Sequence, residues 1–225
     1  MTRVVPKPAN RGSQKWLQTA VNEKRAILNS AILQQFTEAN HQTIEWLSPI
    51  KSDDYAEYKD NNFLQRLNIN LSDRSLVSFW PQRGPQWDGL AKIENEKILL
   101  IEAKSHLLEM QSPATRASKP SRNLIQESLI ETKSFLGVQS ETDWAGMYYQ
   151  YTNRIAHLYL LRELNNIPVY LVFLCFINDK EMKGPTTIEE WQASIHKLET
   201  HLGLPAVHKL SDYIMHIYLD ISLLQ

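Results

Sequence analysis

The chain has 225 residues, of which 43% are hydrophobic and 22% charged, and its formal net charge at pH 7 is −1. This length and composition suit one globular domain over 1–225, with a core large enough to fold alone. A net charge near zero excludes a polycation that binds nucleic acid over its whole surface, so any such binding needs a local patch. The single cysteine, Cys175, excludes an internal disulfide and a cysteine-based zinc site.

The sequence predicts no membrane segment. Its longest apolar run, residues 169–177, is too short to span a bilayer. The N-terminus shows no apolar stretch typical of a signal peptide. We therefore expect no membrane partner and a cytoplasmic location.

Residues 1–12 form an expected irregular arm, because Pro6, Pro8 and Gly12 disfavour regular structure. The arm begins a basic region that extends to residue 25, and a second basic stretch covers residues 104–123. Residues 38–60 are acidic instead. Such charges usually cover solvated helix faces, but the basic segments could also approach phosphates.

The first half of the chain predicts helices followed by strands. Apolar residues recur at helical spacing from Ser13, a plausible N-cap, to Ile32, and residues 51–67 predict a weaker, acidic helix. Residues 75–80 are a strand candidate. Residues 87–94 and 97–104 predict a hairpin that turns near Asn95.

The second half alternates helices and strands. A long irregular segment, 105–120, precedes a helix from Pro120 to about Leu136. The later predicted elements are a helix at 141–164, a buried strand at 167–179, a helix at 187–202 and a strand at 216–221. This order predicts an α/β sandwich, with helices flanking one central mixed sheet, rather than a doubly wound Rossmann fold.

One charged triplet stands out because it ends an apolar strand. Glu102-Ala103-Lys104 directly follows Ile98 to Ile101, where unpaired charge would be costly. Side chains at i and i+2 of a strand share a face, so Glu102 and Lys104 point the same way. Asp88, on the other arm of the hairpin, falls near Glu102, and two such carboxylates can share a hard cation such as Mg²⁺. The plain alternative is a surface salt bridge at a strand end.

The register of the hairpin decides whether this cluster forms. A three-residue turn at 94–96 gives paired positions that sum to 190 and sets Asp88 across from Glu102. A two-residue turn at 95–96 gives 191 and puts the two carboxylates on opposite faces, unless a bulge intervenes. We expect the odd-residue turn or a bulge.

Asp88 followed by Glu102-Ala103-Lys104 resembles the PD-(D/E)xK nuclease superfamily over roughly residues 13–178, with Trp87 where the family name has proline. The resemblance implies a restriction-endonuclease-like fold and Mg²⁺- or Mn²⁺-dependent hydrolysis of phosphodiester bonds. It implies metal ligands at Asp88 and Glu102 and a catalytic Lys104. Glu23 is a further candidate ligand, because similar nucleases often add an acid from the first helix; its alternative is an exposed helix charge.

The candidate substrate contacts lie in two places. Gln150, Asn153 and His157 share one face of a predicted helix, which could contact the substrate backbone or simply face solvent. Arg116, Lys119 and Arg122 surround a predicted helix start and could approach phosphates.

The sequence thus predicts a metal-dependent endo- or exodeoxyribonuclease that binds nucleic acid, with DNA as the expected substrate. One rival is an inactive module of the same fold that binds nucleic acid or protein. The other is a hydrolase of a smaller phosphorylated substrate. The sequence leaves open whether the protein forms a homodimer.

Overall fold

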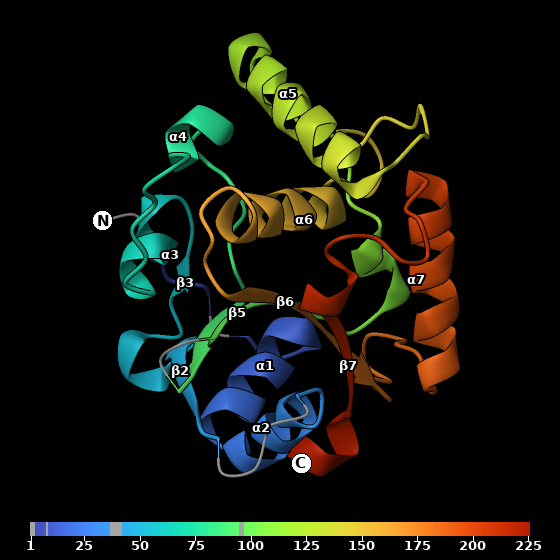
Figure 1. Ribbon diagram of the computed structural model, residues 1–225. Coiled ribbons are helices and arrows are strands. Elements are labelled where there is room, and N and C mark those ends of the chain that lie inside the picture. Colours follow the sequence, from blue (N-terminus) through green and yellow to red (C-terminus); the bar gives the residue numbers. More distant parts are fainter. Residues whose placement is uncertain (1–2, 8, 37–41, 95–96) are drawn as a thin grey trace.

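A five-stranded mixed sheet lies at the centre of the computed structural model, which describes residues 3–7, 9–36, 42–94 and 97–225 (Figure 1). Its strands follow the order β2-β4-β5-β6-β7, with bounds Ile44–Ser48, Gly89–Ile93, Lys97–Lys104, Val169–Ile177 and Ile214–Asp220. β2, β4 and β5 form an antiparallel meander, whereas β5, β6 and β7 run parallel. The parallel pairs are joined by helical crossovers, as such connections require.

Helices cover both faces of this sheet. Their bounds are Gly12–Asn22 (α1), Arg25–Leu33 (α2), Asn61–Arg66 (α3), Leu76–Phe79 (α4), Lys119–Leu136 (α5), Tyr149–Arg162 (α6) and Ile188–Leu202 (α7). In Figure 1, α1 and α2 lie on one side of the sheet, and α6 lies on the other, with α5 beyond it. The described residues therefore form a three-layer α/β sandwich, as the sequence predicted.

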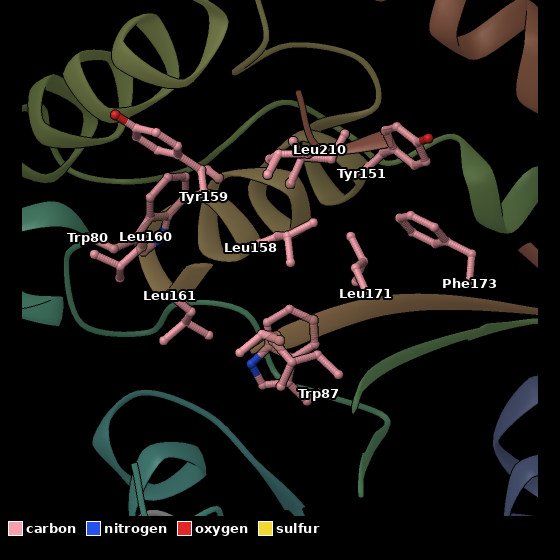
Figure 2. Packing of buried hydrophobic residues seen from close by; sticks show 14 of the residues in the cluster. Trp80, Trp87, Tyr151, Leu158, Tyr159, Leu160, Leu161, Leu171, Phe173 and Leu210 are labelled. Atoms are coloured by element: carbon pink, nitrogen blue, oxygen red, sulfur yellow. The ribbon is translucent and has the colours of Figure 1, made fainter. Parts of the chain in front are cut away.

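Alternation along β5 explains why both faces are buried. Ile98 and Leu100 belong to the core under α6, whereas Leu99, Ile101 and Ala103 belong to the core under α1 and α2. Figure 2 shows Leu158 of α6 and Leu171 and Phe173 of β6 filling the space between helix and sheet. A strand with two buried faces must be apolar almost throughout, which is why Glu102 and Lys104 are exceptional on this one.

Several predicted elements are confirmed. The helix predicted from Pro120 to Leu136 is α5, which begins with Lys119 and has Gly137 in the left-handed region as its C-cap. The strand predicted at 167–179 is β6, and the helix predicted at 187–202 is α7, which starts with a capping box at Thr187. The strand predicted at 216–221 is β7, shifted by one to two residues.

The prediction of a strand at residues 75–80 is wrong. Residues 75–80 contain the short helix α4, because the Ser75 side chain caps it at Ser78 N, and Leu76 and Phe79 are both buried at a three-residue spacing. The strand that pairs with β4 is β2, from the segment 44–48, which alternates buried and more exposed positions around Trp46.

Three predicted helices differ from the structure. The helix predicted over 13–32 is two helices, broken at Glu23 and Lys24, and its N-cap is Arg11 rather than Ser13. The predicted helix at 51–67 contains a 3-10 turn, the two-residue strand β3 (Glu57–Tyr58) and α3. The predicted helix at 141–164 begins only at Tyr149, because a turn closed by Asp143 precedes it.

The N-terminal arm is tied to the body of the protein. Its strand β1 (Arg3–Val4) pairs with β3, and the Arg3 guanidinium forms ion pairs with Asp53 (3.1 Å) and Asp54 (2.5 Å). Pro8, residues 38–41 of the acidic stretch and the predicted turn residue Asn95 lie outside the described residues. No helix in the described ranges is long and apolar enough to cross a membrane.

Candidate active site

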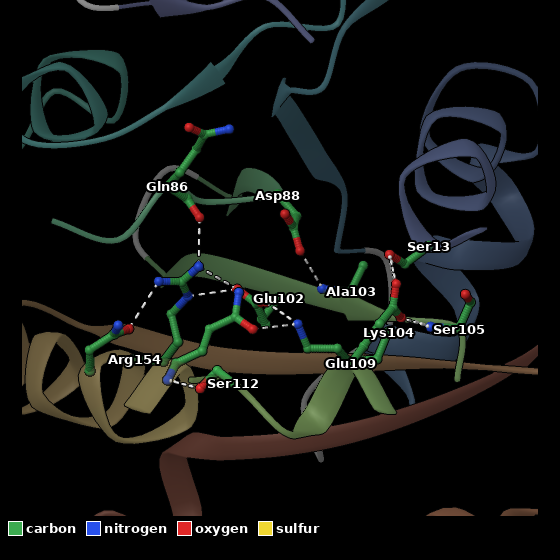
Figure 3. A network of polar contacts seen from close by, with 12 residues as sticks. Ser13, Gln86, Asp88, Glu102, Ala103, Lys104, Ser105, Glu109, Ser112 and Arg154 are labelled. Carbon is green, nitrogen blue, oxygen red and sulfur yellow. Dashed lines mark hydrogen bonds and ion pairs between the residues drawn. The ribbon is translucent and has the colours of Figure 1, made fainter. Parts of the chain in front are cut away.

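The register of the hairpin brings Asp88 and Glu102 to the same face of the sheet. Gly89 pairs with Ile101 and Ile93 pairs with Lys97, so paired positions sum to 190. This is the register that a three-residue turn predicts, and the parity prediction is confirmed. The Asp88 carboxylate accepts a hydrogen bond of 2.8 Å from the backbone N–H of Ala103, which fixes it beside the Glu102-Lys104 segment (Figure 3).

Glu102 and Lys104 form a buried ion pair. The Lys104 ammonium lies 2.5 Å from Glu102 Oε1, and the residues are only 7% and 1% exposed, respectively. Burial acts to lower the pKa of Lys104, but the carboxylates of Glu102 and Asp88 outweigh it and raise that pKa above its usual value. The two carboxylates therefore favour the charged form of Lys104.

The pKa of Asp88 is raised as well, which in a carboxyl group favours the neutral form. Burial and the neighbouring Glu102 charge raise its pKa well above the usual value, and Glu57 adds to the effect, while Lys104 and the Ala103 N–H oppose it. Asp88 lines a groove, whereas Glu102 lies deeper. A carboxylate in this environment gains from any cation that enters beside it.

Helix α6 supplies a polar partner for each member of the Glu102–Lys104 pair. Lys104 donates a hydrogen bond of 2.9 Å to Gln150 Oε1, and Arg154, one helical turn later, donates from Nε to Glu102 Oε2 at 2.6 Å. Although burial acts to raise it, the pKa of Glu102 is lowered because Arg154 and Lys104 both stabilise its charged form. Gln150 was predicted as a substrate contact, and the structure joins it to Lys104.

A third carboxylate, Glu57 on β3, lies close enough to affect the other two. Its oxygens accept hydrogen bonds from the Gln14 amide of α1, at 2.8 Å, and from the Gln86 amide. Burial raises the pKa of Glu57, and the charge of Glu102 adds to this. The sequence prediction missed Glu57, whose only signal was that Glu57 and Lys59, in an acidic stretch, repeat the Glu-x-Lys spacing of Glu102 and Lys104.

The predicted metal ligand Glu23 is not brought to these carboxylates. It is exposed and directly follows the C-terminal end of α1, whereas Gln14, near the start of that helix, contacts Glu57. Glu23 lies nine positions after Gln14, which corresponds to about 13.5 Å along the helix axis.

Asp88 borders a groove of about 1100 Å³ between the 80–88 and 112–118 segments and the start of α6. Among the described residues that line it, the basic ones are Arg83, Arg116 and Arg154, and the acidic one is Asp88. The groove is therefore positively charged around one carboxylate, an arrangement that favours an anionic ligand.

The remaining predicted contacts have different positions. Arg116 and Asn153 line the groove, and Asn153 also accepts a hydrogen bond from Arg154 at 3.0 Å. Lys119 and Arg122 are exposed at the start of α5 and are not among the lining residues.

His157 corrects the expectation of a continuous polar helix face. It is 1% exposed and packs against the rings of Trp80, Trp87 and Phe63, and burial lowers its pKa to about 3. Its Nδ1 lies 2.8 Å from the Asn153 carbonyl oxygen. His157 is thus a neutral core residue and contacts neither solvent nor the groove.

The donor set of Asp88 and Glu102 fits a hard divalent cation. Mg²⁺ in phosphate-processing sites is often bound through one or two carboxylates, with water and substrate phosphate completing the shell. Glu102 Oε1 accepts one hydrogen bond from Lys104, which leaves a second lone pair on that oxygen. Within the described ranges, no group of three or more His, Cys, Asp or Glu side chains is arranged to hold a metal ion. No family model matches the sequence, and no curated protein or solved structure matches it either.

Proposed function

We propose that the protein is a metal-dependent nuclease of the restriction-endonuclease-like fold, which hydrolyses phosphodiester bonds in DNA. The hairpin register carries this proposal, because it sets Asp88, Glu102 and Lys104 on one face at the end of a buried strand. The sheet order and the helices on both faces are compatible with that fold. The basic groove beside Asp88 supports a polyanionic substrate.

Asp88 and Glu102 would hold Mg²⁺ or Mn²⁺, which when bound activates water and stabilises the leaving oxygen. Lys104, kept protonated by the two carboxylates, would offset the negative charge that develops on the phosphorus-bound oxygens. Gln150 would hold the ammonium in place for this task. Arg116 and Arg83 would contact phosphates along the groove and so orient the strand.

An inactive module of the same fold is the second candidate, and one observation favours it. Both oxygens of Glu102 already accept charged hydrogen bonds, one from Lys104 and the other from Arg154. A structural ion-pair network of this kind perturbs pKa values without any catalysis. The groove would then bind nucleic acid without cleaving it.

A cleavage assay separates the two candidates. Labelled duplex DNA, single-stranded DNA and RNA would each be incubated with Mg²⁺, Mn²⁺ or EDTA, using wild-type protein and Asp88→Asn. The nuclease proposal expects cleavage of DNA that needs the metal and is lost in Asp88→Asn. Binding without cleavage under every metal condition would favour the inactive module.

A further inference from the structure

Arg154 lies at the centre of the polar network although it is 3% exposed. It projects from α6 toward the sheet, and its guanidinium packs over the Trp87 ring, 4.7 Å from the ring centroid. Figure 3 shows it between Glu102 and the chain segment that leads to Asp88. Burying an arginine costs free energy unless its donors are paired, so the acceptors that Arg154 contacts indicate its structural role.

The guanidinium bridges β5, which carries Glu102, and the segment that leads to Asp88. Nε donates to Glu102 Oε2 at 2.6 Å, and Nη2 lies 2.6 Å from that same oxygen. Nη2 also donates to the Gln86 carbonyl oxygen at 2.6 Å, two residues before Asp88. Nη1 donates to Asn153 Oδ1 at 3.0 Å, which fixes the plane of the group.

We infer that Arg154 is a positioning residue, which sets the separation of Asp88 and Glu102 by binding Glu102 and the backbone before Asp88 at the same time. This inference rests on the proposed function and deepens it. Its alternative is that Arg154 serves only as a charge that offsets Glu102.

The positioning role depends on the shape of the side chain, whereas the charge-only role does not. Arginine presents several donors in a rigid fork, whereas lysine is a point charge on a flexible stem. Arg154→Lys therefore keeps the positive charge near Glu102 but cannot bridge to the Gln86 carbonyl in the same geometry. Arg154→Gln removes the charge as well.

The test is the affinity for Mn²⁺, measured by titration calorimetry without nucleic acid, together with the melting temperature of each variant. Positioning predicts that both Arg154→Lys and Arg154→Gln bind Mn²⁺ about 10- to 100-fold more weakly than wild type, the usual effect of losing a residue that orients a metal ligand. Arg162→Lys is the matched control. That arginine lies on the same helix but packs on Tyr213 and donates to the Val169 carbonyl, and its variant should bind Mn²⁺ like wild type.

Other results overturn the inference. A charge-only role predicts that Arg154→Lys binds like wild type and that Arg154→Gln binds more tightly, because a repelling cation has gone. If Arg154→Gln does not fold, Arg154→Lys decides alone, since it retains the charge that Glu102 needs. Wild-type protein that takes up no Mn²⁺ would overturn the proposed metal site and this inference together, whereas uptake that Arg154→Lys leaves unchanged overturns only the inference.

Discussion

Gln150 and Lys104 are joined by a hydrogen bond of 2.9 Å between helix α6 and strand β5. The Gln150 backbone N–H donates a hydrogen bond of 2.7 Å to the Ser112 hydroxyl, which fixes the position of the backbone from which the Gln150 side chain extends. Among the described residues, the Lys104 ammonium has two acceptors, Gln150 and Glu102, which fix its direction and leave its remaining donor for another acceptor.

Gln150→Ala should lower turnover while leaving metal affinity almost unchanged. Without this acceptor, Lys104 keeps its ion pair with Glu102 but can rotate, and misplacing a catalytic group by about 1 Å can cost up to about 100-fold in rate. Single-turnover cleavage rates and Mn²⁺ titrations would measure the two effects separately. Gln192→Ala, at an exposed position on α7, is the control and should leave both unchanged. Equal cleavage rates in Gln150→Ala and wild type would show that this contact has no part in the reaction.

Lys104→Ala should keep the fold and metal binding but lower the melting temperature, because the buried Glu102 loses one of its two cationic partners. It should reduce turnover by roughly 10²- to 10⁴-fold, a range typical of a lost catalytic group. Lysine is not a metal ligand, and removing a cation beside two carboxylates can even tighten the metal. The rate at saturating Mg²⁺ measures the loss. Lys133→Ala removes a lysine that holds the carbonyl oxygens of Ser140 and Thr142, so it should affect stability alone. A Lys104→Ala enzyme as fast as wild type would make this lysine an ordinary strand-end charge.

The buried His157 should make the protein less stable in acid. Its pKa is about 3 in the folded chain against 6.5 in an exposed histidine. As the pH falls from 6.5 toward 3, the unfolded chain binds a proton that the folded chain does not, so acidification favours unfolding by up to about 5 kcal/mol.

His157→Phe should therefore weaken the dependence of the melting temperature on pH between 7 and 4. Some dependence should remain, because burial also lowers the pKa of His216, to about 4. His196→Phe changes an exposed histidine and should keep the wild-type profile. A His157→Phe profile parallel to that of wild type would mean that His157 titrates normally in the folded protein.

The groove and the N-terminal arm should contribute differently to DNA binding. Arg116 lines the groove, whereas Arg3 is already paired with Asp53 and Asp54. Arg116→Ala should reduce the slope of log affinity against log salt by about 1. With one phosphate contact fewer, binding releases fewer counterions from the DNA. Arg3→Ala should leave the slope unchanged. The reverse result would restore the arm as the phosphate-binding element.

The sequence predicted those parts of the site that follow from local pattern. Strand periodicity and a parity argument were sufficient to place Asp88, Glu102 and Lys104 on one face, because register is a property of two adjacent strands. Long amphipathic or uniformly apolar segments also predicted α5, α7 and β6.

The contacts that the sequence prediction missed are set by tertiary packing. In the sequence, Arg154 looks like a charged residue on the exposed face of a helix. It becomes a partner of Glu102 only because α6 packs against β5. His157 shares a helical face with Gln150, yet Trp80 and Phe63, from other parts of the chain, enclose it. Residues 75–80 contain the strand-favouring residues Val77, Phe79 and Trp80, but the Ser75 cap and the burial of Leu76 and Phe79 favour one helical turn.

Diffraction from crystals soaked in millimolar Mn²⁺ tests most directly whether Asp88 and Glu102 form a metal site. Anomalous scattering identifies the ion independently of any activity, and Asp88→Asn crystals provide the control. We predict an anomalous peak between the Asp88 and Glu102 carboxylates in the wild-type protein and none in the variant. A wild-type crystal without that peak, with the Glu102–Lys104 and Glu102–Arg154 pairs intact, would contradict the proposed metal site.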